Sequence, residues 1–85
     1  MELGVDDGEN ARSMVNVAKE SILAEEIEYY GFDYFSESKR DQVQHKLEEM
    51  GCMFKLFKGD ILNTLPKVAE TLPKMDLIFI DGGKF

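Results

Sequence analysis

The stretch of sequence that indicates the fold is the last one, Met75-Asp76-Leu77-Ile78-Phe79-Ile80-Asp81-Gly82-Gly83-Lys84-Phe85. Its four consecutive apolar residues, 77–80, are too few for a helix and include β-branched and aromatic side chains. This pattern predicts a strand that is buried on both faces, as in the middle of a parallel sheet. The Asp-Gly-Gly that follows is either a simple turn or part of a ligand site, because ligands bind at the carboxyl ends of strands in open α/β sheets.

The composition indicates one small folded domain over residues 1–85. Apolar residues make up 44% of the chain, yet none of its apolar runs approaches the length of a membrane span. Cys52 is the single cysteine, so a disulfide framework is excluded and we expect a cytoplasmic protein. The net charge is −7, with ten acids and four bases among residues 1–40. Without a basic stripe, nucleic acid is not an expected partner.

Helical and strand patterns alternate along the chain. Apolar stripes at helical spacing predict helices near residues 10–23, 38–50 and 64–71. Apolar or alternating segments predict strands near residues 27–33, 52–58 and 75–81. Strands joined by crossovers of helix length form a mostly parallel sheet, so we predict a three-layer α/β fold.

The first residues of these helices are indicated by capping residues. Asn10, Asp7 or Gly8 can cap the first helix, Ser38 the second and Thr64 the third. The segment that precedes Gly4 has only three residues, which is too short for a complete strand.

Glycine and aspartate gather at the predicted carboxyl ends of the strands. They form the loop 4–8, Asp33, Gly59-Asp60 and Asp81 to Gly83. Because these ends meet at one edge of a parallel sheet, together they indicate a pocket. Asp33 follows Gly8 by 25 residues, close to the spacing of an acid that holds a ribose. The acids of the loop favour a cationic or zwitterionic ligand over a bare phosphate.

At these positions the sequence resembles the class I S-adenosylmethionine-dependent methyltransferases, which have a Rossmann-like fold. Glu2-Leu3-Gly4-Val5-Asp6-Asp7-Gly8 is similar to the first motif of that family, with Asp6 in place of its middle glycine. The resemblance implies that Glu2, Gly4 and Gly8 line the methionine part of S-adenosylmethionine. It also implies that Asp33 binds the ribose hydroxyls and Asp60 the adenine amino group, with Asp81 in the fourth motif.

The fourth motif resembles that of metal-dependent O-methyltransferases acting on small molecules. In that comparison Asp81 corresponds to a ligand of a divalent cation such as Mg²⁺, and Lys84 to a general base. A bound cation and an amine would both help to deprotonate a hydroxyl group of a small-molecule methyl acceptor. The alternative for Lys84 is an ordinary solvated lysine.

The resemblance covers the cofactor-binding half of a fold that has seven strands. We therefore expect an incomplete methyltransferase domain that is not catalytically complete in this chain. Exposed strand edges then predict self-association, or a packing in which strand 75–81 joins strand 27–33 directly.

Two alternatives remain at this stage. One is a small acidic interaction module in which Tyr29, Tyr30, Tyr34 and Phe35 form an aromatic contact patch. The other is a nicotinamide-dependent oxidoreductase domain, which is disfavoured because the tight GxGxxG turn is missing.

Overall fold

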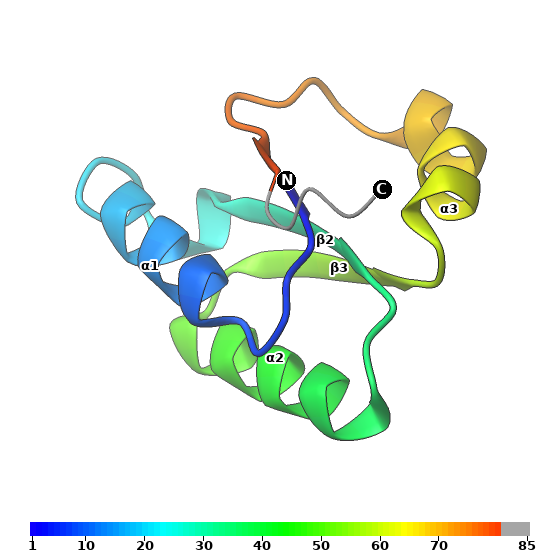
Figure 1. Cartoon of the computed structure of the whole chain (residues 1–85). Coiled ribbons are helices and arrows are strands. Elements are labelled where there is room, and N and C mark those ends of the chain that lie inside the picture. The colour runs from blue at the N-terminus through cyan, green and yellow to red at the C-terminus, as the bar shows by residue number, and fades with distance from the viewer. Residues whose placement is uncertain (81–85) are drawn as a thin grey trace.

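The computed structural model describes residues 1–80 as an α/β fold (Figure 1). Its elements, in chain order, are β1 (Glu2–Leu3), α1 (Glu9–Ala18), the 3₁₀ turn η1 (Ala24–Glu26), β2 (Glu28–Asp33), α2 (Glu37–Met50), β3 (Met53–Lys58), α3 (Ile61–Val68), the 3₁₀ turn η2 (Ala69–Thr71) and β4 (Phe79–Ile80). The strands within residues 1–80 form one parallel sheet in the order β3-β2-β1-β4. The predicted fold class is therefore confirmed.

Helices cover both faces of this sheet. In Figure 1, α1 and α2 lie side by side on one face, and α3 lies on the other. The core under α1 and α2 is built by Val5, Ala11, Val15, Ile27, Tyr29, Phe35, Val43, Leu47, Met50 and Cys52. The core under α3 is smaller and consists of Leu3, Tyr30, Phe32 and Ile61, with Phe57 stacked on Phe32 at a ring distance of 4.7 Å. The alternation of β2 thus supplies both layers, as expected of a central strand.

The short segment before Gly4 has a central place in the sheet. Glu2 pairs with Gly31 of β2 on one side and with Phe79 of β4 on the other. The expected direct pairing of the last strand with the second is therefore wrong. Two residues suffice because backbone hydrogen bonds from both neighbours hold β1, including the bond from Gly4 N to Phe32 O at 2.8 Å.

Several helix boundaries differ from the predicted ones. The first helix ends at Ala18 rather than near residue 23, and Gly8 is its N-cap. Ser36, not Ser38, caps α2 by accepting a hydrogen bond from Lys39 N. The third helix begins at Ile61 rather than near residue 64, because Asp60 caps it one turn earlier than Thr64 would.

The apolar run that predicts a strand buried on both faces lies at an edge of the described sheet. Only Phe79–Ile80 pairs as a strand, rather than residues 75–81, and its described neighbour is β1 alone. The exposed fractions of residues 77–80 range from 39% to 60%. The predicted burial of this segment is wrong for the described residues, since a run of apolar side chains is buried only where other elements cover both faces.

Gly31 of β2 lies where the neighbouring side chains leave little room for a Cβ atom. A Cβ atom at this position would lie 2.9 Å from Tyr29 Cε1, 3.0 Å from Val5 Cγ2 and 3.1 Å from Leu56 Cδ2. Gly31→Ala is expected to lower the free energy of unfolding by about 1–3 kcal/mol, because the added methyl group overpacks the core. Urea unfolding followed by circular dichroism measures this loss.

The matched control is Leu62→Ala, which removes atoms from a side chain that is 66% exposed. It should change the free energy of unfolding by no more than about 0.5 kcal/mol. Equal stability of Gly31→Ala and the wild-type chain would contradict the packing described here.

Candidate functional site

The carboxyl ends of β1, β2 and β3 meet at one edge of the sheet, as predicted. The loop 4–8 leaves β1 beside the end of β2, and Gly59 N donates a hydrogen bond to Asp33 O at 3.0 Å, so that Asp60 follows next to the end of β2. The structure thus brings together the loop, Asp33 and Asp60. Asp81 and Lys84, which the sequence places at the same edge, lie outside the described residues.

The loop 4–8 has a backbone with three positive φ angles. Gly4, Asp6 and Gly8 have φ values of 90°, 57° and 87°. Asp6 can replace a glycine here because aspartate is among the few residues that tolerate the left-handed region. At Gly8 a side chain would also be crowded, since a Cβ atom would lie 3.0 Å from Val43 Cγ2 of α2. Gly8 therefore lets the start of α1 approach α2 closely.

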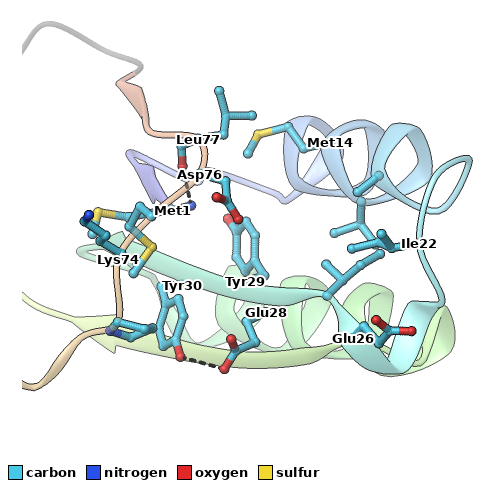
Figure 2. A pocket seen from close by; sticks show the side chains of 15 residues that line it. Met1, Met14, Ile22, Glu26, Glu28, Tyr29, Tyr30, Lys74, Asp76 and Leu77 are labelled. Atoms are coloured by element: carbon cyan, nitrogen blue, oxygen red, sulfur yellow. Dashed lines mark hydrogen bonds between the residues drawn. The ribbon is translucent and has the colours of Figure 1, made fainter.

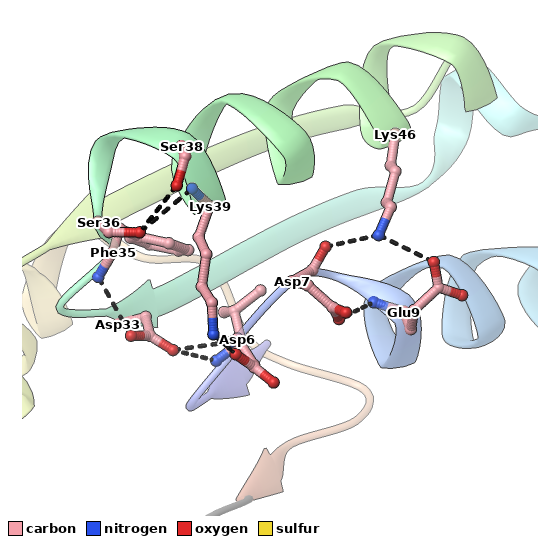
Figure 3. A network of polar contacts seen from close by, with 10 residues as sticks. Asp6, Asp7, Glu9, Asp33, Phe35, Ser36, Ser38, Lys39 and Lys46 are labelled. Atoms are coloured by element: carbon pink, nitrogen blue, oxygen red, sulfur yellow. Dashed lines mark hydrogen bonds and ion pairs between the residues drawn. The ribbon is translucent and has the colours of Figure 1, made fainter.

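The Asp33 carboxylate binds the loop to the end of β2 (Figure 3). Its Oδ2 accepts hydrogen bonds from Val5 N at 2.7 Å and Asp6 N at 2.9 Å, and its Oδ1 accepts one from Phe35 N at 3.1 Å. Partial burial opposes ionisation of Asp33, but the backbone N–H groups of Asp6, Phe35, Val5 and Tyr34 outweigh it and hold the pKa of Asp33 below its ordinary value. A carboxylate has about four acceptor positions, and four backbone N–H groups already face those of Asp33.

Two lysines of α2 hold the acidic part of the loop (Figure 3). Lys39 Nζ pairs with the Asp6 carboxylate, which raises the pKa of Lys39. Lys46 Nζ donates to the carbonyl of Asp7 at 2.7 Å and pairs with Glu9 Oε1 at 2.8 Å. Asp6 and Glu9 therefore have cationic partners from α2, which lowers the negative charge that a ligand would meet. The preference for a cationic or zwitterionic ligand over a bare phosphate stays a prediction.

Asp60 joins the site through the start of α3. Its Oδ1 accepts a hydrogen bond from Leu62 N at 3.0 Å, and its carbonyl accepts one from Thr64 N at 2.8 Å. The side chain therefore has a capping role, and its second oxygen is a further acceptor at the sheet edge.

Glu2 lies beneath the loop rather than at its surface. Its side chain is fully buried, and it accepts hydrogen bonds from Tyr29 Oη at 2.5 Å and Asn10 Nδ2 at 2.9 Å. Burial, followed by the charge of Glu2 and the hydrogen bond to it, raises the pKa of Tyr29 far above its ordinary value.

A cavity of about 200 Å³ lies at the opposite, amino edge of the sheet (Figure 2). Figure 2 shows it between α1, the starts of β1 and β2 and the segment before β4, with Met14, Ile22 and Tyr29 among its lining side chains. Among the described residues, none of those predicted to bind a cofactor lines it. The cavity is therefore separate from the candidate site.

A family model described as "Methyltransferase domain" matches residues 1–84, almost the whole chain. The chain belongs to this methyltransferase family. No curated protein and no solved structure matches it. The parallel sheet with α1 and α2 on one face and α3 on the other agrees with a Rossmann-like methyltransferase fold.

The candidate site was only partly visible in the sequence. The glycines and aspartates at the strand ends were identified, whereas Asn10, Tyr29, Lys39 and Lys46 were not assigned to it. From the sequence, Asn10 is a possible helix cap, and Tyr29 belongs to the second predicted strand and to the alternative contact patch. Asn10 lies two residues after the loop 4–8, and this closeness is the sequence signal that could have indicated its contact with Glu2.

Residues 1–80 form neither a cluster of metal-ligating side chains nor a membrane-spanning helix. Within that range, His, Cys, Asp and Glu side chains form no group of three or more that could hold a metal ion. No described helix is both long enough and apolar enough to span a membrane.

The pKa of Asp33 leads to a pH-dependent stability. Because this pKa is lower in the folded protein than in the unfolded chain, the stabilisation is present above the unfolded pKa and is lost as the pH falls through the folded one. Asp33→Asn is therefore expected to be less stable than wild type at pH 7, with a difference that shrinks below about pH 4. Urea unfolding at a series of pH values measures this difference.

Asp41→Asn, an exposed acid of α2, is the control for the loss of one negative charge. Its difference from wild type should stay small and change little with pH. A constant difference between Asp33→Asn and wild type from pH 7 to pH 3 would contradict the role of the ionised Asp33.

Proposed function

We propose that the chain binds S-adenosylmethionine at the carboxyl edge of its sheet, as the cofactor-binding half of a methyltransferase acting on a small molecule. The observation that carries this proposal is the contact between Asp33 and the loop 4–8. Its hydrogen bonds to Val5 N and Asp6 N bring the acid proposed for the ribose against the glycine loop proposed for the methionine part.

The chemistry of the site fits the two polar ends of this cofactor. The Asp33 carboxylate would accept from a ribose hydroxyl in place of one of its backbone donors, and the second oxygen of the Asp60 cap suits the adenine amino group. Gly4 would let the ligand approach the loop backbone, while Gly8 keeps the end of the loop packed against α2. When bound, the cofactor would supply an electrophilic methyl group, while the residues named here bind and orient it.

Asp81 and Lys84 belong to the catalytic part of this proposal. Asp81 would bind a Mg²⁺ ion together with the acceptor hydroxyl, and Lys84 would take up its proton. We expect the chain alone to bind the cofactor without completing catalysis. A cytoplasmic location fits the single, buried Cys52.

The test is a titration of ¹⁵N-labelled protein with S-adenosylhomocysteine, followed by amide shifts in NMR. Saturable shifts are expected at residues 4–8 and around Asp33 and Asp60. Asp60→Asn keeps a good helix cap but removes the charge, and it should weaken binding by about tenfold, the effect of one charge-assisted hydrogen bond.

Asp76→Asn makes the same chemical change at the amino edge of the sheet, beside the separate cavity. It should bind S-adenosylhomocysteine as tightly as wild type. A well-folded sample that shows no shifts at saturating ligand would refute cofactor binding by this chain.

A second candidate function, an interaction module, is supported by a different surface from the one first expected. Three of the four aromatic residues of the expected contact patch are buried, and only Tyr34 is exposed. Four consecutive exposed apolar side chains lie instead on residues 77–80, beside an edge of β4 that is unpaired within the described sheet. Such an edge favours pairing with a second copy of the chain.

Self-association through β4 predicts a molar mass that rises with protein concentration in light scattering. Ile80→Lys should keep the chain monomeric, because a charge on an edge strand opposes pairing. Leu23→Lys, at an exposed position between α1 and η1, is the control and should associate like wild type. A monomeric wild-type chain at all concentrations would rule out this proposal.

A further inference from the structure

We propose that Asn10 and Tyr29 are positioning residues that hold Glu2 in a buried clasp and thereby set the shape of the cofactor loop. This inference rests on the proposed binding of S-adenosylmethionine at the loop 4–8. In this proposal Glu2 supports the loop from the core of the protein. It does so through Asn10 and Tyr29, two residues that lie outside the family motif.

The clasp joins three elements around one carboxylate. Glu2 is on β1, Asn10 is in the first turn of α1, and Tyr29 is on β2. Glu2 Oε2 accepts from Asn10 Nδ2 at 2.9 Å, and Glu2 Oε1 accepts from Tyr29 Oη at 2.5 Å. An ionised carboxylate can accept from an amide and a hydroxyl at the same time, so the residue types match their contacts.

The position of the clasp relates it to the loop. Glu2 precedes the loop 4–8 and Asn10 follows it, so the bond between them joins the two ends of the loop across its base. On the other side of the same loop, Asp33 accepts hydrogen bonds from Val5 N and Asp6 N. The loop is thus held at its base by Asn10 and at the sheet edge by Asp33.

Because Glu2 is buried, the loss of one of its hydrogen bonds costs more free energy than it would at the surface. Glu2 is fully buried, and a buried carboxylate that loses one hydrogen-bond donor is left with part of its desolvation penalty uncompensated. We expect the first turn of α1 to shift so that the Glu2 carboxylate regains a donor. This shift would change the conformation of the loop 4–8, which is joined to α1. Removing either donor should therefore loosen the loop before it unfolds the domain.

The chain offers a matched control for each donor. Tyr29→Phe removes the hydroxyl that donates to Glu2, whereas Tyr30→Phe removes one that donates to Glu28 at 3.3 Å, from the opposite face of the same strand. Asn10→Ala removes the other donor, whereas Asn16→Ala makes the same change at an exposed position of α1.

The first readout is hydrogen exchange of the Val5 and Asp6 amides without ligand, measured relative to the amides of α2. In Tyr29→Phe and Asn10→Ala this relative exchange should be about tenfold faster, the equivalent of one net hydrogen bond. Tyr30→Phe and Asn16→Ala should stay within about twofold of wild type on the same scale. Exchange that rises equally in the loop and in α2 would show only a general loss of stability and would overturn the proposal.

The second readout is the affinity for S-adenosylhomocysteine at a temperature where all variants are folded. Tyr29→Phe and Asn10→Ala should bind about five- to tenfold more weakly, with both controls unchanged. Unchanged affinity in both clasp variants would overturn the positioning role. If wild type itself does not bind, the proposed function fails, while the exchange experiment still decides whether the clasp shapes the loop.

Discussion

The contact between the Asp33 carboxylate and the backbone of the loop 4–8 organises the candidate site. It connects the end of β2 to the segment between β1 and α1. The hydrogen bonds from Val5 N and Asp6 N to Asp33 span 28 and 27 residues of the chain. Backbone N–H groups are strong donors that must find a partner when they leave water. By accepting two of them with one oxygen, Asp33 fixes the loop and remains a candidate ligand for a ribose hydroxyl.

Charged side chains of α2 also hold the loop. Asp6, Asp7 and Glu9 place several negative charges at the start of α1, where the helix dipole favours them. Lys39 and Lys46 reach across from α2 to this segment. These contacts are partly exposed, so they contribute modestly to stability. Their main effect is to fix the position of α2 relative to the loop, together with the close approach of Gly8 to Val43.

The buried carboxylate of Glu2 places a different constraint on the same segment. A charge inside the core is tolerated only when its oxygens have donors, and two of the donors to Glu2 come from α1 and β2. The sheet, the first helix and the loop are consequently coupled through one side chain. The family match over residues 1–84 includes this loop and the three elements that Glu2 couples.

The sequence by itself determined the α/β class, the order of helices and strands and the Gly/Asp clusters at the strand ends. These follow from local patterns, namely the 3.6-residue and 2-residue periods and the turn residues between them. Asp33 and Asp60 were identified in this way because each directly follows a predicted strand. The resemblance to methyltransferases rested on the same clusters, and the family match supports it.

Only the tertiary structure decided how distant segments pair. Glu2–Leu3 lies between β2 and β4 although two residues carry no periodicity, and residues 77–80 are exposed although their apolar run predicts burial. The partners of Glu2 and of the loop acids likewise come from α1, α2 and β2, at sequence distances that no local pattern records. Periodicity indicates which face of an element is apolar, but the position of an element in the sheet depends on contacts with the rest of the chain.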